Sequence, residues 1–135
     1  MATAIIDSEK KKKRRILVVD DEADATFTFK ASLEESGSFE VDVFNDPKLA
    51  LTNFKASWYD LLLLDILMPR MNGFELYEKI TQIDSNVRVC FITAYTTYHR
   101  ALKDLFPTAE VDCLIEKPIG KRELVNRITE VLKLR

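Results

Sequence analysis

Residues 61–69 read Leu61-Leu62-Leu63-Leu64-Asp65-Ile66-Leu67-Met68-Pro69, and this stretch decides the fold. Four consecutive leucines are apolar without alternation, which is typical of a β-strand covered on both faces, as in a parallel sheet. Asp65 then places an acid at the end of that buried strand. A proline and a loop follow it and no helix begins at once, so helix capping does not explain this acid.

The rest of the chain alternates short apolar runs with longer amphipathic stretches. The runs predict strands at 16–19, 41–44, 61–64, 87–92 and 111–115. Helical spacing predicts helices at 23–36, 47–54, 74–83 and 97–105, and a last one from 121 onward. Five strands that each precede a helix imply parallel pairing through right-handed crossovers, and therefore an α/β fold.

Two of the predicted helices have an apolar face that should pack on the sheet. The helix over 23–36 is expected to bury Phe27, Ala31 and Leu33. The last helix has a longer apolar stripe, formed by Leu124, Val125, Ile128, Val131 and Leu132.

Composition excludes several classes of protein. The chain has 135 residues, 47% of them hydrophobic and 31% charged, which suits one compact domain. Three glycines are too few for the glycine-rich motifs that bind dinucleotides or nucleoside triphosphates. No apolar run approaches the roughly 18–20 residues of a membrane span, and no secretory signal is present. Cys90 and Cys113 are predicted to be reduced, buried small hydrophobes, not zinc ligands or a disulfide. We expect a soluble cytoplasmic protein without membrane insertion.

Charge is unevenly distributed along the chain. Residues 1–15 carry six basic and two acidic side chains, and the other residues carry fourteen basic and twenty acidic ones. The basic run 10–15 invites a nucleic-acid or anionic-membrane interpretation. Six consecutive like charges without interleaved aromatic residues are more typical of a solvated arm. We therefore expect a flexible basic arm at 1–14, a domain at 15–135, and no nucleic-acid binding.

Acidic side chains directly follow three of the predicted strands, the first, the third and the fifth, the last of them followed by Glu116. Asp20, Asp21 and Glu22 come after the first strand, and Asp65 ends the third. Ligands of parallel α/β sheets bind beyond the carboxyl ends of the strands, so these residues face the place where chemistry is expected. Acids after strands also cap helices, and for Glu22 that explanation is equally good.

A group of carboxylates in one pocket needs a counter-charge. Two unit charges about 4 Å apart repel by about 4 kcal/mol at an effective dielectric constant near 20. A hard divalent cation with oxygen ligands removes this repulsion, and Mg²⁺ is the natural choice. The fourth strand ends in Thr93, and Lys117 follows the fifth, so a hydroxyl and an ammonium group are expected beside the carboxylates.

Taken together, four motifs resemble the receiver domain of two-component response regulators. They are Ile16–Glu22, Leu64–Pro69 with Gly73, Ile92-Thr93-Ala94, and Lys117-Pro118. The resemblance covers residues 15–135 with the motifs in the right order and spacing. It implies a flavodoxin-like, doubly wound, five-stranded parallel sheet of order 2-1-3-4-5 with five helices.

The resemblance implies a role for each acid of the site. Asp65 would be the phosphoacceptor, whose carboxylate attacks a phosphoryl group to give an acyl phosphate. Asp21, Asp65 and the backbone carbonyl of Leu67 would bind Mg²⁺ directly, and Asp20 would bind it through water.

The resemblance also implies roles for the two residues at the other strand ends. Lys117 would pair with the phosphoryl oxygens, and Thr93 would donate its hydroxyl to one of them on activation. The Lys117-Pro118 bond would be the family's cis peptide. Read without the resemblance, Thr93 is a β-branched strand residue and Lys117 a solvated charge.

At three positions the sequence bears on how the switch is tuned. Many receivers have an aromatic residue three positions before the lysine, and it takes part in the switch. This chain has Leu114 there, so the sequence leaves open how this position takes part in the switch. The positions two beyond the acceptor and two beyond the threonine tune dephosphorylation in the family. Here they are Leu67 and Tyr95, the latter preceded by Ala94. Bulky side chains there should shield the acyl phosphate from water, so a long-lived phosphorylated form is expected.

The function expected from this resemblance is a stand-alone phosphorylation switch and not a multiple-turnover enzyme. A histidine kinase or phosphotransfer protein would act upstream, and a protein effector of unknown identity downstream. The effector, or a second copy in a weak homodimer, would bind the face formed by the fourth helix, fifth strand and fifth helix.

Two alternatives come from other classes of protein. One is an interaction module that works without phosphorylation. The other is a Mg²⁺-dependent phosphatase that forms an aspartyl phosphate. Such phosphatases have a second acid two residues after the nucleophile, where this chain has Leu67.

Overall fold

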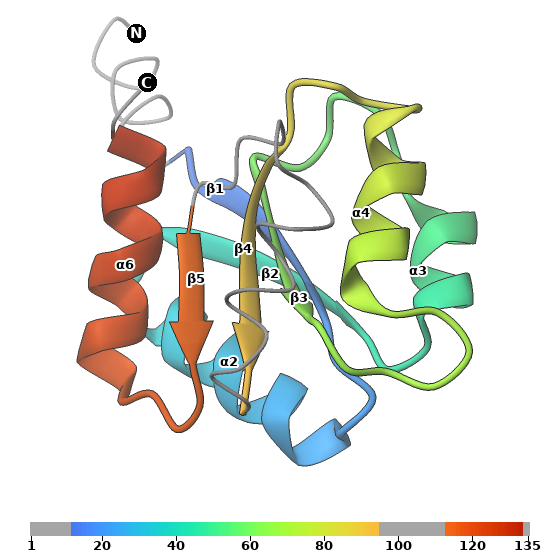
Figure 1. Ribbon diagram of the computed structural model, residues 1–135. Helices are drawn as coiled ribbons and strands as arrows, with labels where there is room; N and C mark the ends of the chain where they lie inside the picture. The colour runs from blue at the N-terminus through green and yellow to red at the C-terminus, as the bar shows by residue number, and fades with distance from the viewer. Residues whose placement is uncertain (1–11, 95–112, 134–135) are drawn as a thin grey trace, which may run out of the picture.

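A computed structural model of the protein describes residues 12–94 and 113–133, and shows a five-stranded parallel sheet of order β2-β1-β3-β4-β5 (Figure 1). The strands are β1 (Arg14–Val19), β2 (Phe39–Phe44), β3 (Leu61–Asp65), β4 (Arg88–Thr93) and β5 (Cys113–Glu116). The helices are α2 (Ala23–Glu35), α3 (Pro47–Asn53), α4 (Gly73–Thr81) and α6 (Lys121–Lys133). The predicted sheet is confirmed. The described residues contain four helices where five were expected, and the helix predicted at 97–105 lies outside them.

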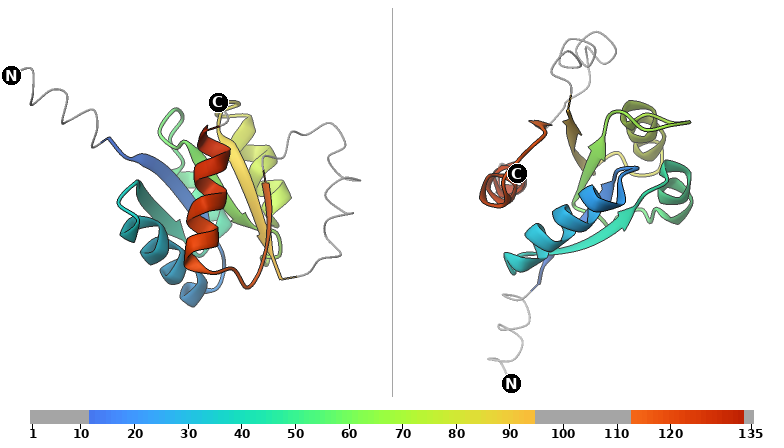
Figure 2. Two further views of the ribbon diagram at one scale, coloured as in Figure 1. Left: turned by 90° about the vertical axis from the view of Figure 1, so that its left-hand side faces the viewer. Right: turned by 90° about the horizontal axis from the view of Figure 1, so that it is seen from below.

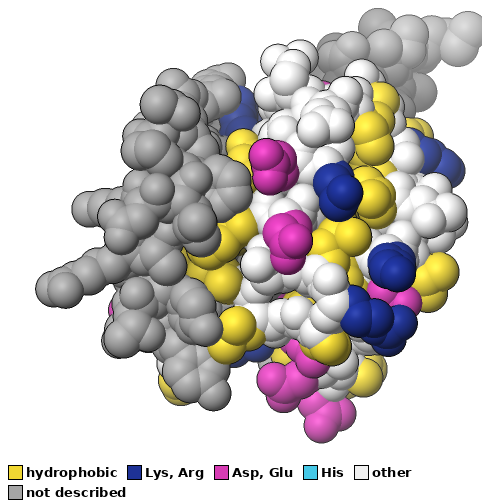
Figure 3. Space-filling view, turned by 45° about the vertical axis from the view of Figure 1, so that its right-hand side comes forward, with side chains coloured by type: hydrophobic (Ala, Val, Ile, Leu, Met, Phe, Trp, Pro, Cys, Tyr) yellow, Lys and Arg dark blue, Asp and Glu magenta, His cyan; other side chains and the backbone are white. Residues whose placement is uncertain are grey.

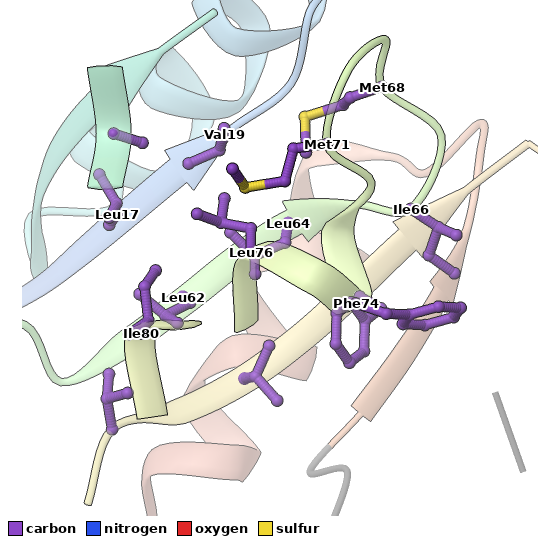
Figure 4. Packing of buried hydrophobic residues seen from close by; sticks show 14 of the residues in the cluster. Leu17, Val19, Leu62, Leu64, Ile66, Met68, Met71, Phe74, Leu76 and Ile80 are labelled. Carbon is purple, nitrogen blue, oxygen red and sulfur yellow. The ribbon is translucent and has the colours of Figure 1, made fainter. Parts of the chain in front are cut away.

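Helices cover both faces of the sheet, α3 and α4 on one and α2 and α6 on the other (Figures 1 and 2). This arrangement explains the unbroken apolar runs, because successive side chains of a strand point to opposite faces and both faces are buried. One face, shown in Figure 4, packs Leu17, Val19, Leu62 and Leu64 against Leu76 and Ile80 of α4. The other packs Ile16, Val18, Leu61 and Leu63 against Phe29, Leu33, Leu124 and Ile128 of α2 and α6.

The prediction for the buried face of α2 was correct for Leu33 and wrong for Phe27 and Ala31. Phe27 is 75% exposed and Ala31 is also exposed, whereas α2 buries Thr26, Phe29, Ser32 and Leu33. The buried face of α2 includes Phe29 and Leu33, and at about 100° per residue Phe27 lies some 160° around the helix from Phe29, on the side that faces solvent. The stripe predicted for α6 is confirmed, with four of its residues buried and Val125 partly buried against the same core.

The prediction that the two cysteines are reduced and form no disulfide was wrong, although Cys90 is buried as predicted and Cys113 is partly buried. Cys90 in β4 and Cys113 in β5 form a disulfide, with their Cα atoms 4.5 Å apart. The two residues are 23 positions apart in the sequence, but the strand register places them directly opposite each other. Sequence spacing alone does not reveal such a pair, because the register is a property of the folded sheet.

Local sequence sets where two of the helices begin. Asp46 is the N-cap of α3 and accepts a hydrogen bond from the backbone N–H of Lys48, with Pro47 at the first helical position. Asn72 and Glu75 form a reciprocal capping box at the start of α4. In the described part of the chain, no helix has the length and apolarity that crossing a membrane requires.

Candidate functional site

The carboxyl ends of four neighbouring strands meet at one edge of the sheet. Asp20 directly follows β1, Asp65 ends β3, Thr93 ends β4, and Lys117 directly follows β5. The strand register pairs Val19 with Leu64, and Thr93 with Glu116, so the four ends are level. In Figure 3, acidic side chains gather at the lower edge of the molecule, toward which the strand arrows of Figure 1 point. The fold therefore brings the sequence-predicted residues to one place.

Three carboxylates form the centre of this site. Asp20, Asp21 and Asp65 each offer an oxygen within 4.8 Å of those offered by the other two. Asp20 and Asp65 are buried and Asp21 is exposed, so the cluster is open to solvent on one side. At 4.8 Å each pair of unit charges repels by about 3.5 kcal/mol at an effective dielectric constant near 20, and by more at a shorter separation. Close oxygen donors with net negative charge form the donor set that Mg²⁺ prefers.

Lys117 supplies a positive charge to the cluster. Its Nζ donates a hydrogen bond to Asp20 Oδ2 at 2.8 Å and lies 3.8 Å from Asp65 Oδ2. The Lys117–Pro118 peptide bond is cis, as predicted, and the Lys117 backbone N–H donates to the Thr93 carbonyl at 2.8 Å. The ammonium group thus contacts both buried carboxylates.

The site shifts the pKa values of two of its groups. Burial, followed by the charge of Asp20, raises the pKa of Asp65 to about 7. The charge of Lys117 and a hydrogen bond from the Leu67 backbone oppose that rise. Burial lowers the pKa of Lys117, but its hydrogen bond to Asp20 and the charges of nearby carboxylates outweigh this and raise it. In the metal-free folded protein, the ionised form of Asp65 is therefore less favourable than it is in water.

Gly73 had no role assigned from the sequence, and the structure shows why that position favours glycine. A Cβ there would overlap the backbone carbonyl oxygen of Asp65. The Gly73 N–H instead donates to the carbonyl of Ile66 at 2.9 Å, so the start of α4 lies directly on the chain that carries the acid.

The remaining candidate residues have different surroundings. The side chain of Leu67 is 41% exposed, Ala94 is exposed after the end of β4, and Leu114 is partly buried in β5. Metal binding by the Leu67 carbonyl stays a prediction. Glu22 is the N-cap residue of α2, but its side chain makes no capping hydrogen bond, so the structure does not support that explanation for it. Tyr95 lies outside the described residues.

Comparison with known proteins identifies the family of the chain that carries these acids and the lysine. The family model of the response regulator receiver domain matches residues 16–129. The chain belongs to that family. Among relatives of this receiver domain, the response regulator receiver protein CpdR of Brucella abortus is 32% identical over 116 residues, covering 86% of this chain and 94% of CpdR.

Some relatives are longer proteins. The transcriptional regulatory protein CpxR homolog of Haemophilus influenzae is 38% identical over 117 residues, covering 87% of this chain and 49% of that protein. The response regulator SaeR of Staphylococcus epidermidis is 32% identical over 116 residues, covering 86% of this chain and 49% of SaeR. The receiver domain thus spans about half the length of these two relatives.

Solved structures agree with the family. A CheY-like receiver domain protein from Methanospirillum hungatei superposes with a TM-score of 0.77 at 28% identity, covering 91% of this chain and 96% of that one. The response regulator TrrA of Thermotoga maritima was solved in complex with Mg²⁺-BeF. It superposes with a TM-score of 0.73 at 30% identity, covering 87% of this chain and 98% of TrrA.

Proposed function

We propose that this receiver domain accepts a phosphoryl group on Asp65 with the help of Mg²⁺ and signals through altered partner binding. The observation that carries the proposal is the cluster of Asp20, Asp21 and Asp65 with Lys117 in contact with two of them. A carboxylate oxygen of Asp65 attacks phosphorus in a phosphohistidine of a kinase or phosphotransfer protein. The phosphorus–nitrogen bond breaks, the imidazole leaves and takes up a proton, and an acyl phosphate forms.

The three carboxylates are suited to hold Mg²⁺. They supply oxygen ligands only, they are close together, and one of them is open to solvent, which suits an ion that retains several waters. Bound Mg²⁺ would neutralise charge on the transferring phosphoryl group. The Mg²⁺-BeF complex of TrrA, a relative of similar fold, supports this assignment.

Lys117 and Thr93 are suited to detect the phosphoryl group. Lys117 Nζ already lies 3.8 Å from Asp65 Oδ2, so a phosphoryl group on that acid would be within its reach and would compete with Asp20 for it. Thr93 is buried at the end of the next strand, and a threonine hydroxyl can donate a hydrogen bond to a phosphoryl oxygen. New contacts at these residues would bias β4, β5 and the surface around them toward a second conformation, which a partner protein would recognise.

We further propose that the domain is a switch and not a multiple-turnover enzyme. Leu67 stands two residues after the acceptor, where an aspartyl-phosphate phosphatase needs an acid, and an aliphatic side chain cannot transfer a proton.

A small phosphodonor tests the proposal. The protein is incubated with acetyl phosphate with and without Mg²⁺, and intact mass is measured. One phosphoryl group should be added, only when Mg²⁺ is present, and hydroxylamine should remove it. Asp65→Asn should abolish the addition, whereas the control Asp24→Asn, which changes an exposed acid in α2, should not. Modification of the Asp65 variant, or continuous phosphate release with many turnovers from unrelated phosphate esters, would overturn the proposal.

A further inference from the structure

The acidic loop between β1 and α2 carries two of the three carboxylates, so its position determines the geometry of the site. The ladder between β1 and β2 ends where the Asp20 N–H donates to the Phe44 carbonyl at 3.2 Å. Beyond that hydrogen bond no strand pairing supports the loop, because β1 and β2 have ended. The Asp20 carboxylate has its own partners, the Glu22 N–H at 3.0 Å and Lys117. These two partners orient the Asp20 side chain, but neither of them connects the loop to β2.

Asn45, the residue directly after β2, makes that connection. Its Nδ2 donates to the backbone carbonyl of Asp20 at 2.8 Å and to Thr26 Oγ1 at 3.0 Å. Thr26 is buried in α2, and its hydroxyl donates in turn to the Ala23 carbonyl at 3.0 Å. One amide therefore bridges the first residue of the acidic loop and the first turn of the helix that follows it. Asp21 lies between these two anchor points.

We propose that Asn45 is a positioning residue for the cation, in that it holds the acidic loop with Asp20 and Asp21 turned toward Asp65 before the metal binds. This inference rests on the proposed Mg²⁺ site. A loop that is already in place does not have to be ordered when the ion binds, and the apparent dissociation constant rises in inverse proportion to the fraction of molecules with the loop in place. Sequence patterns gave Asn45 no role, because the neighbouring Asp46-Pro47 was sufficient to explain the start of α3.

The exposure of the Asn45 side chain makes it possible to test its effect on metal binding without disturbing the hydrophobic core. Asn45 is exposed, so its replacement by alanine opens no cavity in the core. Asn53 is a matched control. It is also exposed, and its Nδ2 also donates to a backbone carbonyl, that of Leu49 at 2.8 Å, but this contact lies within α3.

The test is a calorimetric titration of the unphosphorylated full chain with MgCl₂. Asn45→Ala should raise the Mg²⁺ dissociation constant about threefold to tenfold, as expected for the loss of one or two neutral hydrogen bonds. Asn53→Ala should leave it unchanged, and both variants should unfold at similar temperatures in EDTA. Asn45→Gln, which keeps the amide donor, should recover part of the affinity. In the acetyl phosphate reaction, Asn45→Ala should raise the Mg²⁺ concentration for half-maximal rate and leave the rate at saturating Mg²⁺ unchanged.

Three results would overturn the inference. The first is equal Mg²⁺ affinity in wild type and Asn45→Ala. The second is a loss of affinity that Asn53→Ala shares. The third is a reduced rate at saturating Mg²⁺ with an unchanged half-maximal concentration. Failure of the proposed function looks different, because the wild-type protein itself would then show no Mg²⁺ binding at this site.

Discussion

Replacing Asp65, the proposed phosphoacceptor, with asparagine should make the metal-free domain more stable at neutral pH. Asp65 is only 5% exposed, and burial together with the charge of Asp20 raises its pKa to about 7, despite the opposing charge of Lys117. Asparagine has nearly the shape of the protonated acid and does not ionise. The variant therefore keeps the packing of the neutral form at every pH.

The magnitude follows from the difference in pKa between the folded and unfolded states. In the unfolded chain the acid has its ordinary pKa of 3.8, so between about pH 4 and pH 7 the folded protein binds a proton that the unfolded chain does not. Wild-type stability therefore falls as pH rises through this interval and levels off above it. Three pKa units correspond to about 4 kcal/mol. Asp65→Asn should gain at most about 4 kcal/mol at pH 8, about 2 kcal/mol at pH 5, and nothing below pH 4.

Urea unfolding in EDTA at pH 5 and pH 8 measures this gain. The control Asp24→Asn changes an exposed acid and should have no comparable effect. Added Mg²⁺ should reduce the advantage of Asp65→Asn, because the ion stabilises the wild-type carboxylates more than it stabilises the variant. An equal gain at both pH values, or no gain at pH 8, would refute the reasoning that burial of this carboxylate opposes folding.

Three further predictions concern other parts of the domain. Polar substitution of Leu67 and Tyr95 should speed decay of the phosphorylated form in a phosphate-release assay, and unchanged decay would show that these side chains do not shield the acyl phosphate from water. Gly73→Ala should cost about 1–3 kcal/mol in urea unfolding because its Cβ overlaps a backbone carbonyl, whereas Gly120→Ala, which meets nothing within 4 Å, should cost much less. Cys113→Ser should lower stability by about 3 kcal/mol under non-reducing conditions, from the loop-closure entropy of a 23-residue separation, and under reducing conditions its difference from wild type should largely disappear.

Patterns along the chain predicted the parallel strands and the polar residues that follow them, and the resemblance to receiver domains supplied the strand order and the residue roles. Residues 16–19 and 61–64 are continuous apolar runs, and such runs are typical of central parallel strands that are buried on both faces. In the strand order that the resemblance implies, the acids and the lysine follow neighbouring strands and are expected to meet, because parallel strands end at the same edge. That is why Asp20, Asp65 and Lys117 could be named before any coordinates.

The features that sequence missed depend on packing in three dimensions. Phe27 was assigned to the core because it is apolar, but the phase of α2 is set by Phe29 and Leu33 against the sheet. The pairing of Cys90 with Cys113 follows from the register of β4 and β5. The side-chain amide of Asn45 contacts the backbone of Asp20, in a loop that is distant in the sequence. In each case the residue type fits several environments, and only the contacts distinguish them.

The disulfide between β4 and β5 has a practical consequence for any study that cuts the chain. Because it joins Cys90 to Cys113, the polypeptide between them is a covalent ring closed through sulfur. A protease that hydrolyses one peptide bond inside this ring leaves both halves of the protein attached to each other. Such a nick would be invisible by size on a non-reducing gel and would become two bands after treatment with a thiol. Resistance to proteolysis in this region should therefore be judged on reduced samples.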